Sequence, residues 1–201
     1  MAVLNFNESY TFSQIFSLNA EVDDIVADFG YSLARTRLNL PSYEGELGRL
    51  QELRDRINEI LPFVSLTTEI ARREILISRV VTELVHYTQA QLRIEYPLKI
   101  SEQLQGSLDY LLRTDTQMIV IEAKKEDLTN GFKQLAAEMI ALDRWMDSPQ
   151  KQLIGAVTTG ILWQFSRLDR ETKHIEQGLE NYRVPEDVDT LMRILVKSLL
   201  R

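Results

Sequence analysis

The segment Met118–Ala123 constrains the fold of this 201-residue chain more than any other feature, because it is apolar except for one acid. Its first four residues, Met-Ile-Val-Ile, leave no polar face, so the strand that they predict must be covered on both sides. Such a strand lies at the centre of a sheet, between layers of helices. Glu122 therefore falls where a charged side chain is costly without a compensating partner.

Helical and extended patterns alternate along the rest of the chain. Apolar residues at helical spacing predict helices over residues 20–29, 47–61, 67–88, 129–140 and 188–199. Strand-like segments cover residues 32–38, 92–100, 107–113, 118–123, 153–157, 161–168 and 173–176. We expect an α/β fold, with a mixed β-sheet flanked by helices. A mostly helical N-terminal extension over residues 1–64 is expected to pack on a core over residues 65–201.

Composition excludes several kinds of chemistry. The chain has no cysteine and only two histidines, which excludes disulfides, thiolate zinc sites and cysteine nucleophiles. Its 30 acidic and 23 basic residues give a net charge of −7, which argues against a basic arm or a polybasic membrane binder. It contains neither an apolar run of about 18–20 residues nor the pattern of a signal peptide. We expect a soluble, cytoplasmic protein with no membrane partner.

Asp109, Glu122 and Lys124 are expected to share one face of the sheet. The sequence Thr-Asp-Thr-Gln at residues 114–117 predicts a tight hairpin turn between two strands. If Thr114 pairs with Gln117, Asp109 lies directly across from Glu122, with the two β-carbons about 4.5–5.5 Å apart. Lys124 follows two residues later and shares the face of Glu122. A register error of one residue would break this alignment.

Two carboxylates so close together repel each other, and burial adds a desolvation cost. A hard cation such as Mg²⁺ or Mn²⁺ would compensate both effects, and the carbonyl of Ala123 offers a third oxygen ligand. Lys124 could hold or deprotonate an attacking water, or stabilise charge on a phosphate. These residue types indicate phosphodiester hydrolysis. The alternative is a solvated sheet face on which Lys124 pairs with Glu122, and the apolar surroundings of Glu122 argue against it.

The helix expected over residues 67–88 carries a further acid. Its apolar stripe includes Ile70, Ile77 and Leu84. At about 100° per residue, Glu74 falls about 40° from Ile70 and inside the stripe, and Glu69 lies near its edge. An acid within an apolar stripe has no local explanation, so this helix is expected to contribute to the same site.

The order of these residues resembles the PD-(D/E)XK nuclease superfamily. A glutamate on a first helix, Asp109 on a strand, Glu122-Ala123-Lys124 on the next strand and a helix with Gln134 are similar to its common core. The run Gly-Ala-Val-Thr-Thr-Gly-Ile-Leu-Trp-Gln-Phe at residues 155–165 is similar to a strand–turn–strand in nuclease domains of type I restriction enzyme R subunits. The resemblance covers roughly residues 65–170.

The resemblance implies a restriction-endonuclease-like fold and cleavage of DNA that depends on Mg²⁺ or Mn²⁺. Asp109 and Glu122 would bind the metal, and Lys124 would position the water. The family pattern favours Glu69 as the acid of the first helix, whereas the helical wheel favours Glu74.

Gln134 matches the glutamine of the Gln-x-x-x-Tyr motif of related nucleases. Glu138 stands at the tyrosine position. This departure concerns contacts with DNA ends or flanking DNA and leaves the expected metal site intact.

Two other classes of function stay open. A nuclease fold without activity could serve as a DNA-binding or assembly module, which the net charge of −7 mildly favours, since nonspecific DNA affinity depends on phosphate neutralisation. An interaction subunit without nucleic acid could assemble through its amphipathic N-terminal helix. The chain has no Gly-x-x-x-x-Gly-Lys-Ser/Thr loop, so translocation would need a separate motor or specificity subunit. Cleavage of both strands would favour a homodimer.

Overall fold

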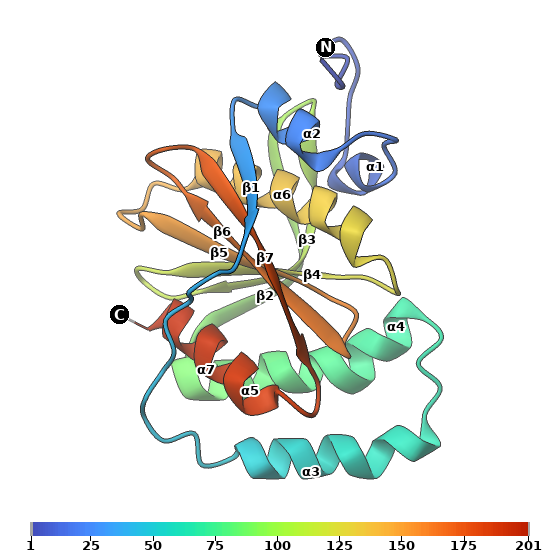
Figure 1. The fold of residues 1–201 in the computed structure, drawn as a ribbon, viewed down its shortest axis with the longest axis vertical. Helices are drawn as coiled ribbons and strands as arrows, with labels where there is room; N and C mark the ends of the chain where they lie inside the picture. Colours follow the sequence, from blue (N-terminus) through green and yellow to red (C-terminus); the bar gives the residue numbers. More distant parts are fainter. Residues whose placement is uncertain (1, 201) are drawn as a thin grey trace.

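The computed structural model describes residues 2–200, which form a seven-stranded mixed sheet with helices on both faces (Figure 1). The strands are β1 (Ser32–Thr36), β2 (Gln91–Ser101), β3 (Leu104–Arg113), β4 (Met118–Ala123), β5 (Gln152–Thr158), β6 (Leu162–Asp169) and β7 (His174–Arg183). The helices are α1 (Phe12–Phe16), α2 (Val22–Asp28), α3 (Leu50–Ile60), α4 (Glu69–Arg72), α5 (Ser78–Thr88), α6 (Leu128–Trp145) and α7 (Val188–Leu199), with short helical turns η1 (Leu61–Phe63) and η2 (Arg73–Ile77). The expected α/β architecture is confirmed.

The strand order β1-β7-β6-β5-β4-β3-β2 places β4 inside the sheet. All six residues of β4 are buried, as its apolar sequence predicts. β4 pairs in antiparallel fashion with β3 and in parallel fashion with β5. The strand with a proline in its interior, β2, lies at the edge of the sheet, where a missing backbone donor is tolerated.

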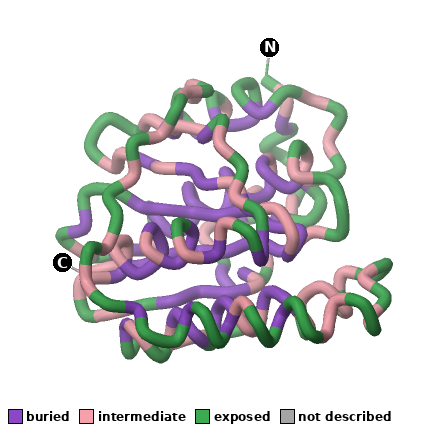
Figure 2. Tube along the Cα trace, turned by 60° about the horizontal axis from the view of Figure 1, so that its bottom comes forward, coloured by how far each residue is buried: buried purple, intermediate pink, exposed green. Residues whose placement is uncertain are grey.

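Two apolar cores lie on opposite faces of the sheet. One contains α1, α2 and α6, and the other contains α3, α5 and α7. In Figure 1, α3 lies outside α5 and α7 and so forms an additional outer layer. Figure 2 shows buried strands enclosed by helices whose outer surfaces are exposed. No helix within residues 2–200 has both the length and the apolar character needed to cross a membrane.

Segment 1–64 contributes to the sheet as well as covering it. β1 lies in this segment and pairs in parallel with β7, from Ser32↔His174 to Thr36↔Gly178. The preceding helix α2 ends before Gly30, which has φ +84° and therefore takes the left-handed conformation that glycine tolerates best. The short helix α1, which packs against α6, was not among the predicted elements.

The register of the β3–β4 hairpin is the predicted one. The pairs run from Arg113↔Met118 to Tyr110↔Ile121, and the amide of Thr114 donates to the carbonyl of Gln117 across the turn (2.9 Å). Asp109 and Glu122 come one step beyond the last of these pairs. This places them level with each other, on neighbouring strands.

The helical wheel was wrong at the start of the helix expected over residues 67–88. Thr68 caps α4 as expected, accepting the amide of Ala71, but η2 is a π-helical turn between α4 and α5. A π-helical turn holds an extra residue and shifts the phase of the residues before it. As a result Ile70 is 72% exposed and Glu74 is exposed, whereas the later stripe residues are buried.

Helix α6 begins earlier than the sequence indicated. Its N-cap is Asp127, whose carboxylate accepts the amide of Asn130 at 2.9 Å. An aspartate is a strong cap because its carboxylate satisfies a free amide at the positive end of the helix. Most of α6 is buried between α1, α2 and the sheet, so its buried polar residues, Gln134, Glu138 and Asp143, require partners.

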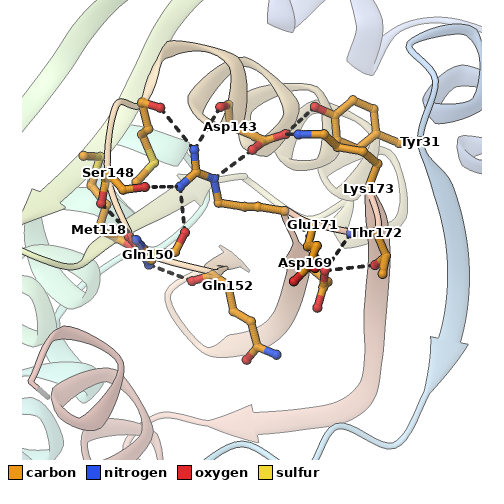
Figure 3. A network of polar contacts seen from close by, with 12 residues as sticks. Tyr31, Met118, Asp143, Ser148, Gln150, Gln152, Asp169, Glu171, Thr172 and Lys173 are labelled. Atoms are coloured by element: carbon orange, nitrogen blue, oxygen red, sulfur yellow. Dashed lines mark hydrogen bonds and ion pairs between the residues drawn. The ribbon is translucent and has the colours of Figure 1, made fainter.

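Asp143, near the end of α6, has such partners (Figure 3). Its side chain is 1% exposed and accepts hydrogen bonds from Tyr31, Arg170 (2.8 Å) and Lys173 (2.6 Å). Arg170 also donates to the carbonyls of Ser148 and Gln150. This Asp143 network joins α6 to the β6–β7 turn and to the start of β1.

Candidate active site

Three of the predicted site residues meet where β3 and β4 cease to pair. Oε1 of Glu122 lies 2.5 Å from Nζ of Lys124. Oδ2 of Asp109 accepts the amide of Ala123 at 2.8 Å. The Asp109 side chain thus binds the β4 backbone directly beside Glu122, which ties the two acids to one place at the end of the hairpin ladder.

Glu122 is buried and poorly compensated. Its side chain is 1% exposed, and within residues 2–200 neither of its carboxyl oxygens accepts a well-aligned hydrogen bond. Burial, followed by the charge of Asp109, raises the pKa of Glu122 to about 8. The ion pair with Lys124 offsets only part of this effect. Carboxyl groups with pKa values perturbed in this way are concentrated at functional sites.

Helix α6 adds a second buried acid that the sequence interpretation missed. Glu138 has no exposed surface, and its carboxyl group faces that of Glu122. Burial and the proximity of Glu122 raise the pKa of Glu138 well above its ordinary value. Two ionised groups in this position would only repel, so the pair holds at least one proton in the metal-free protein.

Gln134 reaches the site through Glu138. Its side-chain amide donates to Oε1 of Glu138 at 2.9 Å, one helical turn away. The side-chain carbonyl oxygen of Gln134 is buried and has no hydrogen-bond donor within residues 2–200. The signal that could have revealed Glu138 was its position among apolar residues of the helix, four residues after the predicted Gln134.

Lys124 is held as a cation. Burial opposes its charge, but Glu122 and then Asp109 outweigh burial and raise the pKa of Lys124. Its Nζ lies 5.1 Å from the centre of the Phe16 ring on α1, a favourable cation–π distance. A β-carbon at Gly131 would come within 2.8 Å of Cγ of Lys124, so the glycine makes room for the lysine stem. A permanently charged lysine orients and stabilises anions rather than acting as a base.

Asp109 has its own cation. Its Oδ1 lies 3.5 Å from Nη1 of Arg73, which comes from the π-helical turn η2. Burial raises the pKa of Asp109, whereas the amide of Ala123 and the charges of Arg73 and Lys124 partly lower it. No spacing rule applied to the sequence assigned Arg73 to the site.

The two acids predicted on the first helix are not buried with this cluster. Glu74 is exposed and Glu69 is partly exposed. Ala123 lies fully buried between the two catalytic candidates. No group of three or more acids or histidines within residues 2–200 is arranged to hold a metal ion.

The donor set still fits a hard cation. Within residues 2–200, Oε2 of Glu122 and Oε2 of Glu138 are buried without a hydrogen-bond donor, and Oε1 of Glu122 is paired with Lys124. Asp109 adds a third carboxyl group at the same level on the neighbouring strand. Oxygen ligands of this kind suit Mg²⁺ or Mn²⁺, which complete their shells with water and substrate oxygens. Asp109 and Glu122 are the residues that would hold such an ion.

Comparison of the sequence with protein-family models gives no match, and comparison with curated proteins gives none either. The assignment of a function therefore depends on the residues and geometry of this site.

Proposed function

We propose that this protein is a metal-dependent nuclease with a restriction-endonuclease-like core, and that it hydrolyses phosphodiester bonds of DNA at Asp109, Glu122 and Lys124. The resemblance of the sequence to PD-(D/E)XK nucleases supports the choice of DNA. A cytoplasmic location, a homodimer and a separate motor or specificity subunit belong to the same proposal.

One observation carries the proposal above the others. Glu122 is fully buried, and among the described residues Lys124 is the one cation paired with it, against the two neighbouring acids Asp109 and Glu138. A sheet that needed only stability would gain nothing from this arrangement, because burying an ion costs several kcal/mol that a single ion pair repays only in part. The arrangement is useful if a cation and a phosphate enter.

Each side chain then has a distinct task. Asp109, fixed by the amide of Ala123, and Glu122 hold the cation. When bound, a cation of this class lowers the pKa of its water and stabilises negative charge on phosphate. Lys124 orients the attacking water or stabilises the charge that develops on the phosphate. Glu138 shares a proton with Glu122, and binding of a cation by Glu122 would release that proton to solvent.

A plasmid-cleavage assay tests the proposal. Supercoiled and linear DNA are incubated with Mg²⁺ or Mn²⁺ and the wild type, Asp109→Asn, Lys124→Met or Lys125→Met. Lys125 is exposed and adjacent to the site lysine, which makes it a matched control. We expect cleavage by the wild type and Lys125→Met, and loss of at least about a hundredfold in the two site variants.

Unchanged cleavage by Asp109→Asn would overturn the proposal. DNA binding by the wild type without cleavage in either metal would favour the alternative, an inactive nuclease fold used for DNA binding or assembly.

A further inference from the structure

A third acid extends the row formed by Asp109 and Glu122. On the edge strand β2, Glu95 falls between the pairs Ile94↔Tyr110 and Tyr96↔Leu108, and so lies level with Asp109. The backbone of Glu95 has φ +52°, which is uncommon for a residue other than glycine or asparagine. Three neighbouring strands therefore present a carboxylate at the same level of the sheet.

Arg73 bridges two members of this row. Its Nη1 lies 2.6 Å from Oε1 of Glu95 and 3.5 Å from Oδ1 of Asp109. Its Nε donates to the hydroxyl of Tyr110 at 3.4 Å, and its guanidinium lies 5.3 Å from the centre of that ring. These contacts fix the plane of the guanidinium beside the site.

The bridge leaves part of the guanidinium unused. No acceptor for Nη2 of Arg73 is found within residues 2–200, and the side chain keeps 17% of its surface exposed. Nη2 is also not among the buried atoms that lack a partner, so solvent reaches it. The N–H donors of Nη2 can form charge-assisted hydrogen bonds with a phosphate oxygen, while Nη1 and Nε stay bound to Glu95 and Tyr110.

The charges around the row favour the same ligand. Among the described residues, Arg73 and Lys124 are the cations paired with Glu95, Asp109 and Glu122. Once a divalent cation takes over the compensation of Asp109 and Glu122, Arg73 is needed there less and its positive charge becomes available. Glu95, 55% exposed, keeps the arginine in place while this happens.

We propose that Arg73 binds a phosphate group of the nucleic-acid backbone at this site, and that Glu95 is the residue that positions it. This inference rests on the proposed function for the identity of the ligand as DNA. It adds a phosphate-binding residue that is not itself a metal ligand, and so it is testable by DNA binding in the absence of cleavage.

The test measures the binding of a fluorescent DNA duplex by anisotropy over a range of salt concentrations, with Ca²⁺ present. The proteins compared are the wild type, Arg73→Gln, Arg73→Lys, Glu95→Gln and Arg79→Gln. Arg79 lies on the same helical segment and donates to the carbonyl of Ile75, so it controls for loss of a helix arginine. Thermal unfolding of each variant verifies the fold.

Arg73→Gln is expected to weaken binding about tenfold, as for loss of one charged hydrogen bond, and to lower the salt dependence by about one unit of slope. Arg73→Lys is expected to restore the slope but not the full affinity. Glu95→Gln is expected to weaken binding while leaving the slope unchanged, because the charge of Arg73 remains. Arg79→Gln is expected to match the wild type.

A folded Arg73→Gln variant with the affinity and slope of the wild type would overturn the inference, as would a wild type that binds no DNA. The proposed function fails separately: a wild type that binds through Arg73 but cleaves nothing would contradict the nuclease and leave the phosphate contact standing. Wild-type cleavage with unchanged DNA binding by Arg73→Gln would support the nuclease and contradict the phosphate contact.

Discussion

Two buried carboxyl groups, Asp143 on α6 and Glu122 on β4, have opposite environments. Asp143 and Glu122 each expose 1% of their side chains. Asp143 receives hydrogen bonds from Tyr31, Arg170 and Lys173 (Figure 3), whereas Glu122 receives none that is well aligned among the described residues. Burial alone would raise both pKa values. For Asp143 the hydrogen bonds, of which that from Lys173 has the largest effect, outweigh burial and lower the pKa. For Glu122 burial outweighs the ion pair with Lys124 and the pKa is raised.

The difference separates an acid that stabilises the fold from one that is available for a ligand. The donors of Asp143 come from three parts of the chain and join them. The charged neighbours of Glu122 among the described residues are two other acids, Asp109 and Glu138, and a single lysine, Lys124. A buried acid with every oxygen satisfied has no capacity to bind a cation, and an unsatisfied one does.

The largest expected effect on stability is that of Asp143→Ala. The substitution leaves Arg170, which is 16% exposed, without its carboxylate in a mostly buried position. Breaking a buried ion pair from one side typically costs about 3–5 kcal/mol. Urea unfolding of Asp143→Ala measures this loss. A loss below about 1 kcal/mol, the scale of exposed ion pairs, would mean that the two acids are energetically alike.

Glu122→Gln is expected to separate activity from stability. Cleavage falls by at least about a hundredfold, whereas the free energy of unfolding stays equal or rises, because a buried and poorly compensated acid is removed. The control is Glu126→Gln, an exposed acid four residues away. Strong destabilisation by Glu122→Gln would show that Glu122 is a structural acid like Asp143.

The metal-free protein should lose stability as the pH rises. Because the pKa of Glu122 is about 8 in the folded chain against 4.5 as its ordinary value, the folded state keeps a proton that the unfolded state releases. Stability from this group is therefore full below about pH 4.5 and declines up to about pH 8.

Urea unfolding between pH 5 and pH 8 measures this decline, which we expect to exceed about 1.4 kcal/mol, the equivalent of one pKa unit. In Glu138→Gln the decline should be smaller, since one member of the pair no longer titrates. The contribution of Asp143 has the opposite sign and is lost only at acid pH, where its lowered pKa is reached. Constant stability across this range would contradict the assignment of Glu122.

Much of the site was predictable from local patterns. The register of β3 and β4 followed from a four-residue turn and from alternation, and it placed Asp109 level with Glu122. Short antiparallel hairpins allow this because the turn fixes the pairing. The buried strand β4 was equally clear from its composition.

Other parts depend on contacts that no local pattern reveals. The π-helical turn η2 changed the phase of its helix, so Glu74 faces solvent and Arg73 reaches Asp109. Glu138 enters the site only because α6 packs across the end of β4. The parallel pairing of β1 with β7 joins segments about 140 residues apart in sequence, from Ser32↔His174 onward.

Titration of Mn²⁺ by calorimetry tests the central claim most directly. The wild type and Asp109→Ala/Glu122→Ala are compared at pH 7 in two buffers of different ionisation enthalpy, first alone and then with an uncleavable DNA duplex. We predict one Mn²⁺ per wild-type chain with release of about one proton, since the ion displaces the proton of the Glu122–Glu138 pair, and no binding to the double variant. Equal binding by both proteins, or no binding by the wild type even with DNA, would contradict the account.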